Sequence, residues 1–383
     1  MKDSPFIYGT TVSTHSFTNR EKDCAKLKSN LLNGINTTLI SPRRWGKSSL
    51  VEKVITDINR SNKEYKTIVI DLFTVGTEEE FLEIFAREVI KASATKWEDW
   101  VKNSKQFFKL LSPKLTLGVD PTSEFSISFD WKEIQKNSDE ILNLPEVIAQ
   151  KKKIKFIICL DEFQNLASFK NFIPFEKKMR AIWQRQKGVT YCLYGSKRHM
   201  MSNLFNNPSK PFYRFGDIML LPKIETEKWV KFIMDSFGTT NKLITEALAS
   251  KIATTMSNHS WYIQQFAHYT WNLTHKKASL IELNSALKEL ISANTPLYQM
   301  EIESLSATQV NLLKAIANGE NKLTSINTMQ NYFLGTPNNV NKNKRNLIEN
   351  DIITESETGF EFMDAAFLIW FKYQYFGISF KID

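Results

Sequence analysis

The chain has 383 residues, 42% of them hydrophobic and including 27 Phe and 9 Trp, so it can build two or three domains with sizeable cores and is not disordered. Its three cysteines are widely separated and its five histidines lack metal-ligand spacing, which excludes a disulfide framework and a zinc site. The net charge of +9 permits contact with nucleic acid or another acidic surface, but a lysine-rich composition gives the same charge without such a partner.

The sequence also bears on the cellular setting. No apolar run approaches the ~18 residues of a membrane span. The amino terminus has no apolar stretch of signal-peptide length. Cys159 and Cys192 lie inside apolar, strand-like runs and are interpreted as small core residues. We therefore expect a cytoplasmic protein without a membrane span.

The first predicted elements are a helix and a strand that leads into a loop. Apolar spacing that includes Leu27 and Leu31 predicts a helix over 16–33. The short apolar strand at 38–40 runs into a loop, 41–49, that reads Ser-Pro-Arg-Arg-Trp-Gly-Lys-Ser-Ser. A triphosphate-binding loop requires this order of strand, tight loop and helix start, because loop N–H groups and the helix N-terminus both bind phosphate oxygens.

The chemistry of this loop rests on its last residues. Lys47 is placed to reach the β- and γ-phosphates of a bound nucleotide, and the Ser48 hydroxyl to bind Mg²⁺. Ser41 stands where such a loop usually has its first glycine, and a side chain there limits the loop geometry. The nucleotide-binding residues predicted from this stretch are Ser41, Pro42, Arg43, Arg44, Trp45, Gly46, Lys47, Ser48 and Ser49.

Strands and helices alternate after the loop. The helix at 47–58 is followed by a buried strand at 67–73 and by helical spacing over 78–92. This alternation predicts a parallel sheet with crossover helices. Two runs of alternating apolar and polar residues flank a turn at 120–123 and predict a hairpin insertion over about 112–131.

A later strand end carries two carboxylates. The unbroken apolar run Lys155–Leu160 predicts a buried parallel strand, and Asp161 and Glu162 follow it directly. Asp161 can hold Mg²⁺ through water, and Glu162 can orient and deprotonate an attacking water. In isolation the pair would be an acidic strand-to-loop turn, but its position downstream of the phosphate loop favours the nucleotide site. No Asn-Lys-x-Asp tetrapeptide for reading guanine occurs, so the predicted cofactors are ATP and Mg²⁺.

The remaining elements divide into three groups. The last strands of the sheet are predicted at 189–194 and 216–221. Beyond them the pattern becomes helical, with a lid of four helices and then three helices and a two-stranded wing, the arrangement of a winged helix. The predicted helices of these two parts are 226–237, 241–255, 261–274, 280–293, 307–317, 323–333 and 338–350.

Several motifs together resemble the archaeal-type ATPase family, part of the AAA+/STAND branch of P-loop NTPases. The motifs are the Phe-Thr-Asn-Arg-Glu entry at 17–21, a Walker A loop at 41–50, a Walker B segment at 160–164, Gly195–Ser196, and Pro-Phe-Tyr-Arg-Phe-Gly at 211–216. The resemblance spans nearly the whole chain. It departs at Ser41 and at the lid segment 258–264, which lacks the usual proline of the nucleotide-sensing turn.

The resemblance implies an α/β fold, with a parallel-sheet P-loop ATPase core at 1–224, a helical lid at 225–300 and a winged-helix domain at 301–383. It also implies that Ser196 senses the γ-phosphate, although Ser196 could instead cap the helix that follows. Arg214 is the first candidate, and Arg198 the second, for an arginine that stabilises transition-state charge, in its own chain or in a neighbouring subunit of a homo-oligomer. Either arginine could instead be a solvated surface residue. Together with Lys47 and Glu162, Arg214 completes the predicted catalytic set.

The helix at 338–350 leaves two functions open. Lys342, Lys344 and Arg345 are suited to contact DNA phosphates and base edges, but the same residues suit a solvated helix in a protein-contact or autoinhibitory domain. The whole protein likewise has two candidate functions. The first is a slow ATPase that acts as a switch and gates an unidentified protein client. The second is a DNA-binding regulator, or a mobile-element or defence factor, in which ATP binding is mainly structural. The pair Asp161–Glu162 favours the first.

Overall fold

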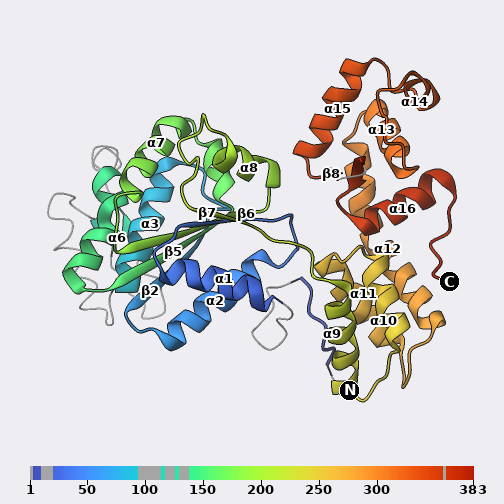
Figure 1. Ribbon diagram of the computed structural model, residues 1–383, viewed down its shortest axis with the longest axis horizontal. Coiled ribbons are helices and arrows are strands. Elements are labelled where there is room, and N and C mark those ends of the chain that lie inside the picture. Colours follow the sequence, from blue (N-terminus) through green and yellow to red (C-terminus); the bar gives the residue numbers. More distant parts are fainter. Residues whose placement is uncertain (1–2, 10–19, 94–113, 117–125, 129–137, 357–358) are drawn as a thin grey trace. The chain divides into compact units, whose positions relative to one another are not determined.

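The computed structural model describes residues 3–9, 20–93, 114–116, 126–128, 138–356 and 359–383 (Figure 1). The chain forms two compact units. The sheet unit consists of Glu21–Ser41 and Leu50–Leu221, and the helical unit of Met1–Arg20, Pro42–Ser49 and Pro222–Asp383.

The centre of the sheet unit is a five-stranded sheet in the order β2-β5-β6-β1-β7. Every pairing between neighbouring strands is parallel, as the alternation of strands and helices predicts. The strands are β1 (Thr37–Ile40), β2 (Tyr65–Asp71), β5 (Lys155–Asp161), β6 (Val189–Gly195) and β7 (Asp217–Leu220). Because all five run the same way, the residues after β1, β5 and β6 emerge at one edge of the sheet.

Helices cover both faces of this sheet (Figure 1). On one face lie α1 (Glu21–Leu32) and α2 (Lys47–Ser61), and on the other α3 (Glu78–Ser93), α6 (Ser138–Lys152) and α7 (Phe172–Trp183). A strand buried on both faces reads as a continuous apolar run, which explains β5. Its residues Phe156, Ile158 and Leu160 join the hydrophobic core that contains α3, α6 and α7. Cys159 is buried beside Cys192 of β6, and both are free thiols, as predicted.

Two details of the sheet unit concern predicted elements. The hairpin is confirmed, since β3 (Lys114–Thr116) pairs with β4 (Ser126–Ser128) in antiparallel fashion, but its turn at 120–123 lies outside the described residues. The first four residues of the helix predicted at 16–33 also lie outside them. The helix α6 was not predicted, and it carries Pro145, a residue that usually ends a helix.

The helical unit has one continuous core formed by the lid helices and the winged helix. The predicted three helices and wing are present, and β8 pairs with β9 in antiparallel register. Its elements are α9 (Thr226–Thr239), α10 (Glu246–Thr255), α11 (Ser260–Leu273), α12 (Leu280–Glu303), α13 (Ala307–Ala317), α14 (Ile326–Asn331), α15 (Pro337–Glu349), β8 (Ile353–Ser356), β9 (Gly359–Phe362) and α16 (Ala365–Phe376). None of the helices that the structure describes has the length and apolar content needed to cross a bilayer.

Helix α12 is ten residues longer than the sequence predicts. Pro296 lies just beyond the predicted end at 293, and a proline removes a backbone donor and restricts the residue before it. The helix continues to Glu303 with Pro296 inside it. Tyr298, beyond the proline, is 3% exposed, and its ring lies 5.2 Å from the Phe367 ring of α16. Tertiary packing on both sides of Pro296 therefore outweighs its cost to the helix.

Candidate functional site

The loop between β1 and α2 has the conformation of a tight turn into a helix. Ile40 ends the strand and α2 begins at Lys47. Gly46 has a φ of 88° and Arg44 a φ of 64°, so the left-handed positions lie in the second half of the loop. Ser41 is buried and has no such φ. Serine therefore costs nothing in backbone conformation where the usual pattern has glycine.

The predicted loop residues differ in exposure. Ser41, Pro42, Lys47 and Ser49 are buried, Trp45, Gly46 and Ser48 are half-buried, and Arg43 and Arg44 are exposed. A buried lysine at a helix N-terminus is unfavourably placed against the positive end of the helix dipole. A phosphate group near this helix start would therefore be stabilised both by the lysine and by the backbone N–H groups.

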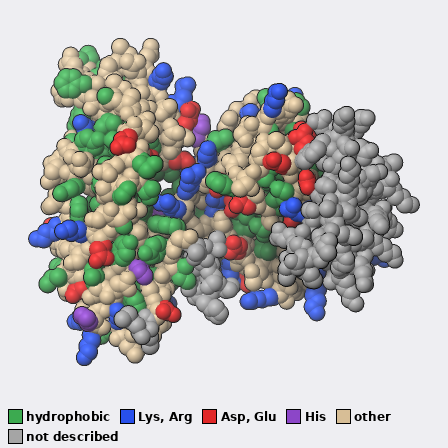
Figure 2. All heavy atoms as spheres, turned by 180° about the vertical axis from the view of Figure 1, so that it is seen from behind, with side chains coloured by type: hydrophobic (Ala, Val, Ile, Leu, Met, Phe, Trp, Pro, Cys, Tyr) green, Lys and Arg blue, Asp and Glu red, His purple; other side chains and the backbone are tan. Residues whose placement is uncertain are grey.

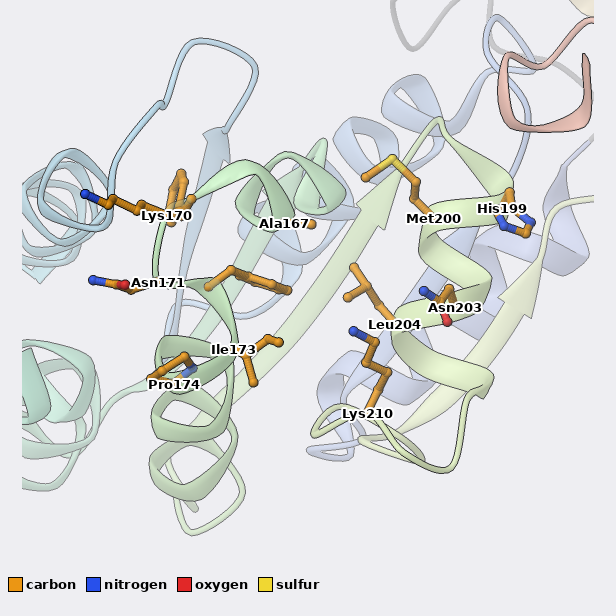
Figure 3. Close-up of a pocket in the computed structure, with 12 residues that line it drawn as sticks. Ala167, Lys170, Asn171, Ile173, Pro174, His199, Met200, Asn203, Leu204 and Lys210 are labelled. Carbon is orange, nitrogen blue, oxygen red and sulfur yellow. The ribbon is translucent and has the colours of Figure 1, made fainter. Parts of the chain in front are cut away.

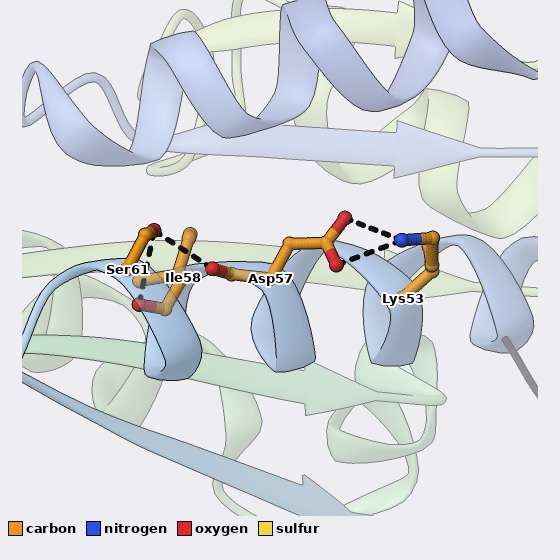
Figure 4. A network of polar contacts seen from close by, with 4 residues as sticks. All are labelled: Lys53, Asp57, Ile58 and Ser61. Carbon is orange, nitrogen blue, oxygen red and sulfur yellow. Dashed lines mark hydrogen bonds and ion pairs between the residues drawn. The ribbon is translucent and has the colours of Figure 1, made fainter.

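An ion pair stabilises α2 behind its N-terminus (Figure 4). Lys53 Nζ lies 2.7 Å and 2.6 Å from the two carboxylate oxygens of Asp57, one helical turn on. Ser61 then donates to the Asp57 carbonyl oxygen at 2.8 Å. Such an i,i+4 pair contributes about 0.3–0.5 kcal/mol to a helix. It supports the helix without using any loop residue.

The two carboxylates at the end of β5 take different roles in the structure. An Asp161 side-chain oxygen accepts the backbone N–H of Glu162 at 2.8 Å. Glu162 has a left-handed φ of 52°, and the 3-10 helix η1 (Phe163–Ser168) follows it. The turn directs the Glu162 carboxylate toward the end of β6. Asp71, at the end of β2, pairs in register with Asp161, and its carboxylate accepts the Phe73 N–H at 2.9 Å.

The end of β6 meets the Glu162 carboxylate. Ser196 is 2% exposed, and its hydroxyl donates to Glu162 Oε2 at 2.9 Å. The Gln164 amide donates to the same oxygen. The N-cap residue of the following helix, α8 (Arg198–Asn206), is Lys197 and not Ser196. The sequence-predicted Ser196 and Glu162 thus lie in contact, whereas sequence reasoning did not single out Gln164.

The two candidate arginines are exposed. Arg214 has a left-handed φ of 51°, and its guanidinium lies 5.2 Å from the centre of the Tyr213 ring. Arg198 begins α8.

Within the helical unit, the loop contacts the lid. The Arg44 guanidinium lies 4.7 Å from the centre of the Trp261 ring at the start of α11. Lys223 lies over the Trp45 ring at 5.7 Å, and Arg20 donates to the Trp45 carbonyl oxygen at 3.0 Å. These are cation–π and charge-assisted contacts. Trp261 lies in the lid segment 258–264 that the sequence singled out only for its missing proline.

His259 and a buried tyrosine–aspartate group adjoin this contact. His259, the N-cap of α11, is 7% exposed, and burial together with the charges of Lys223 and Arg44 lowers its pKa to about 3. The next buried side chain, Tyr262, donates to Asp364, whose pKa is raised by burial. Asp364 also caps α16 by accepting the Phe367 N–H at 2.8 Å. The start of α11 is thus hydrogen-bonded to the N-cap residue of α16, the last helix of the winged helix.

The three basic residues predicted for nucleic acid lie on different sides of α15. Val340 and Leu347 are the buried residues of this helix, and Lys342 and Arg345 are exposed. Lys344 is half-buried, with its ammonium group 5.0 Å from the centre of the Phe360 ring on β9. On the face drawn in Figure 2, Lys and Arg side chains are distributed over much of the visible surface with Asp and Glu among them.

A separate pocket of about 430 Å³ lies in the sheet unit between the start of α7 and α8 (Figure 3). Lys170, His199 and Lys210 line it together with apolar residues such as Ile173 and Leu204. None of the residues predicted from the sequence lines this pocket.

The parallel sheet, the loop before α2 and the C-terminal three helices and wing define the fold of P-loop ATPases with a winged helix. A family model described as a probable winged helix domain matches residues 296–373. A search of curated proteins by sequence found no match.

Solved structures have the same fold over nearly the whole chain. The Walker-type ATPase PABY2304 of Pyrococcus abyssi superposes with a TM-score of 0.67 at 18% identity, covering 96% of this chain and 99% of that one. The ORC2 protein of Aeropyrum pernix, solved with ADPNP and ADP, superposes with a TM-score of 0.57 at 12% identity, covering 96% and 93%. The structural neighbours thus include a Walker-type ATPase and an ORC2 protein.

Proposed function

We propose that this protein binds Mg·ATP at the loop 41–49, hydrolyses it slowly and uses its nucleotide state to gate a protein client. The observation that carries the proposal is the Glu162 carboxylate, which two donors hold at the end of β5. A site that only stores nucleotide has no need of a water-activating carboxylate. A structure of similar fold supports the proposal that the ligand is an adenine nucleotide, since the ORC2 protein of Aeropyrum pernix was solved with ADPNP and ADP.

Magnesium fits the donors that the chain offers. Ser48 supplies a hydroxyl and Asp161 a carboxylate, and Mg²⁺ prefers oxygen ligands. It usually takes one or two from the protein and the rest from water and phosphate, so this pair suffices. When bound, the ion would neutralise phosphate charge.

The chain's own residues have distinct tasks in the proposed reaction. A water oxygen attacks the γ-phosphorus, the bond from that phosphorus to the bridging oxygen of ADP breaks, and Glu162 accepts the proton that the water loses. Lys47 balances charge on the β- and γ-phosphates, and Ser196 is a hydrogen-bond donor to the γ-phosphate. Arg214, or Arg198 as second candidate, stabilises transition-state charge in its own chain or in a neighbouring subunit of a homo-oligomer.

Calorimetric titration with Mg·ATP tests nucleotide binding. Replacing Lys47 by Ala should weaken ATP binding about 10- to 100-fold, because a hydrogen bond to a charged group is worth about 1.5–3 kcal/mol. Lys53→Ala is the matched control, since it removes a lysine of the same helix whose partner is Asp57. Equal ATP affinity in wild type and Lys47→Ala would overturn the proposed binding site.

Phosphate release under steady state tests hydrolysis. Glu162→Gln should keep ATP affinity but lose turnover by about 10²- to 10⁴-fold, because the water loses its base. We expect low turnover in the wild type as well, since a switch awaits its client. If turnover is unchanged in Glu162→Gln, this residue is not the base.

A second function has its own supporting observation. Lys342 and Arg345 are exposed on α15, and the helix before the wing is a common DNA-contacting element of helix-turn-helix proteins. In this alternative the protein is a DNA-binding regulator, or a mobile-element or defence factor, in which ATP is mainly structural. A normal DNA affinity in Glu162→Gln, together with no effect of nucleotide on that affinity, would favour it.

A further inference from the structure

The side chain of Gln164 is built into the sheet unit in a specific orientation. It is 1% exposed, and its Nε2 donates to Glu162 Oε2, the oxygen that also accepts the Ser196 hydroxyl. A carboxylate only accepts hydrogen bonds, so the amide must present its NH₂ group to Glu162. The Gln164 carbonyl oxygen is then buried, and it has no hydrogen-bond partner among the residues that the structure describes.

The end of β6 is shaped for this side chain. A Cβ on Gly195 would lie 1.8 Å from Gln164 Oε1 and 2.9 Å from the sulfur of Met201. Gly195 has no left-handed φ, so the backbone conformation does not require glycine there. The requirement is space. An unpaired buried oxygen and a glycine in a buried strand are both unfavourable, which indicates that the amide donation to Glu162 has a use.

We propose that Gln164 is a positioning residue for the base Glu162, an inference that rests on the proposed ATPase activity. Gln164 holds Glu162 by Oε2 and so fixes the direction in which the carboxylate faces. The Ser196 hydroxyl has one proton and can donate either to Glu162 or to a γ-phosphate, but not to both. When Ser196 turns to the phosphate, Gln164 keeps Oε2 in place.

The first test removes the donor. Gln164→Leu is close in volume and has no amide, so it should lower kcat about 10- to 100-fold, part of the 10²–10⁴ that a general base supplies. The KM and the calorimetric ATP affinity should stay within about twofold, because no phosphate contact is lost. Gln186→Leu is the matched control, since Gln186 donates to a backbone carbonyl and contacts Tyr191 away from Glu162. It should lower thermal stability without a specific loss in kcat.

The second test replaces the donor by an acid of the same shape. Two adjoining carboxylates share one proton, and the shared proton restores a donor to Glu162. The kcat of Gln164→Glu relative to wild type should therefore be highest at acidic pH and fall as the pH rises. A purely structural role for Gln164 would change this ratio only in step with the thermal stability of the variant, measured at the same pH values.

Failure of this inference differs from failure of the proposed function. Hydrolysis that is lost in Glu162→Gln but unchanged in folded Gln164→Leu overturns the positioning role alone. A wild type that binds Mg·ATP but releases no phosphate overturns both.

Discussion

Single residues of the loop decide what its backbone can do. The sequence pattern raised a concern about Ser41, but the left-handed positions are Arg44 and Gly46. A Cβ on Gly46 would meet nothing within 4 Å, so glycine is used there for its φ and not for space. At Gly195, by contrast, glycine is needed for space, because a Cβ there would overlap the Gln164 side chain. The same residue type thus serves two different physical needs.

His259 should make the stability of the protein depend on pH. Its pKa falls from an unfolded value near 6.5 to about 3 in the folded state. The unfolded chain therefore binds a proton first as the pH drops. The stability contribution is complete above pH 6.5 and is lost between pH 6.5 and 3. For this group alone, unfolding free energy should fall by about 1.4 kcal/mol from pH 7.5 to 5.5.

Denaturant unfolding at the two pH values measures this effect. His259→Phe should show a smaller loss of stability at pH 5.5 than wild type. His275→Phe is the control, since His275 is an exposed histidine of the same unit. The same loss in wild type and His259→Phe would show that other groups carry the pH effect.

At the scale of elements, α15 is the helix whose charges can be tested separately. If it binds DNA, log affinity should fall with log salt by about 0.9 for each phosphate that is neutralised. Replacing Lys342 and Arg345 by Ala should then reduce the slope by about 1.8. Lys344→Ala should leave it nearly unchanged, because Lys344 lies over Phe360.

Fluorescence anisotropy with random-sequence duplexes at several salt concentrations measures these slopes. ATP affinity serves as the internal control and should stay the same in both α15 variants. An absence of binding by wild type at low salt would assign the winged helix to protein contact or autoinhibition.

The sequence predicts the helices and strands better than it predicts the tertiary contacts between them. Apolar periodicity was sufficient for the strands of the sheet, the hairpin pair and the winged helix, because each follows from local pattern and burial. It ended α12 too early, since Tyr298 packs against residues about 70 positions later. The sequence analysis also grouped Lys344 with Lys342 and Arg345 as possible DNA contacts. Helical spacing of 100° per residue places Lys344 near the Val340–Leu347 side, a signal that was present but was not used.

Sequence reasoning also missed contacts that depend on the order of strands. Glu162 and Ser196 lie 34 positions apart and meet because β5 is next to β6. Gln164 was part of the Walker B segment, yet nothing in the sequence indicates which way its amide points. Trp261 and Arg44 meet only through tertiary structure. The roles of the predicted site residues stay predictions until the variants are measured.

At the scale of the whole molecule, the loop 42–49 belongs to the same compact unit as the lid and winged helix. The contacts run from Arg44 to Trp261, and from the adjacent Tyr262 to Asp364 at the start of α16. We expect ATP to slow amide hydrogen exchange in the loop and in the first turn of α16. In Trp261→Ala the loop should still be protected, but the protection of α16 should be lost.

Hydrogen exchange with and without Mg·ATP, read by peptide mass spectrometry, checks this expectation. Trp271→Ala is the matched control, since Trp271 lies in the same helix and contacts Lys242 instead of the loop. Equal protection of α16 in wild type and Trp261→Ala would show that the indole does not transmit the nucleotide signal.

The shared core of lid and winged helix has a thermodynamic consequence. Tyr298 of α12 packs on Phe367 and Trp370, so the two parts share one apolar core. We expect a partner that binds the exposed side of α15 to act on the same compact unit that includes the loop 42–49. By reciprocity, whatever factor ATP applies to the affinity for that partner, the partner applies to the affinity for ATP. A client could therefore act as a nucleotide-exchange factor from a distance, without touching the phosphates.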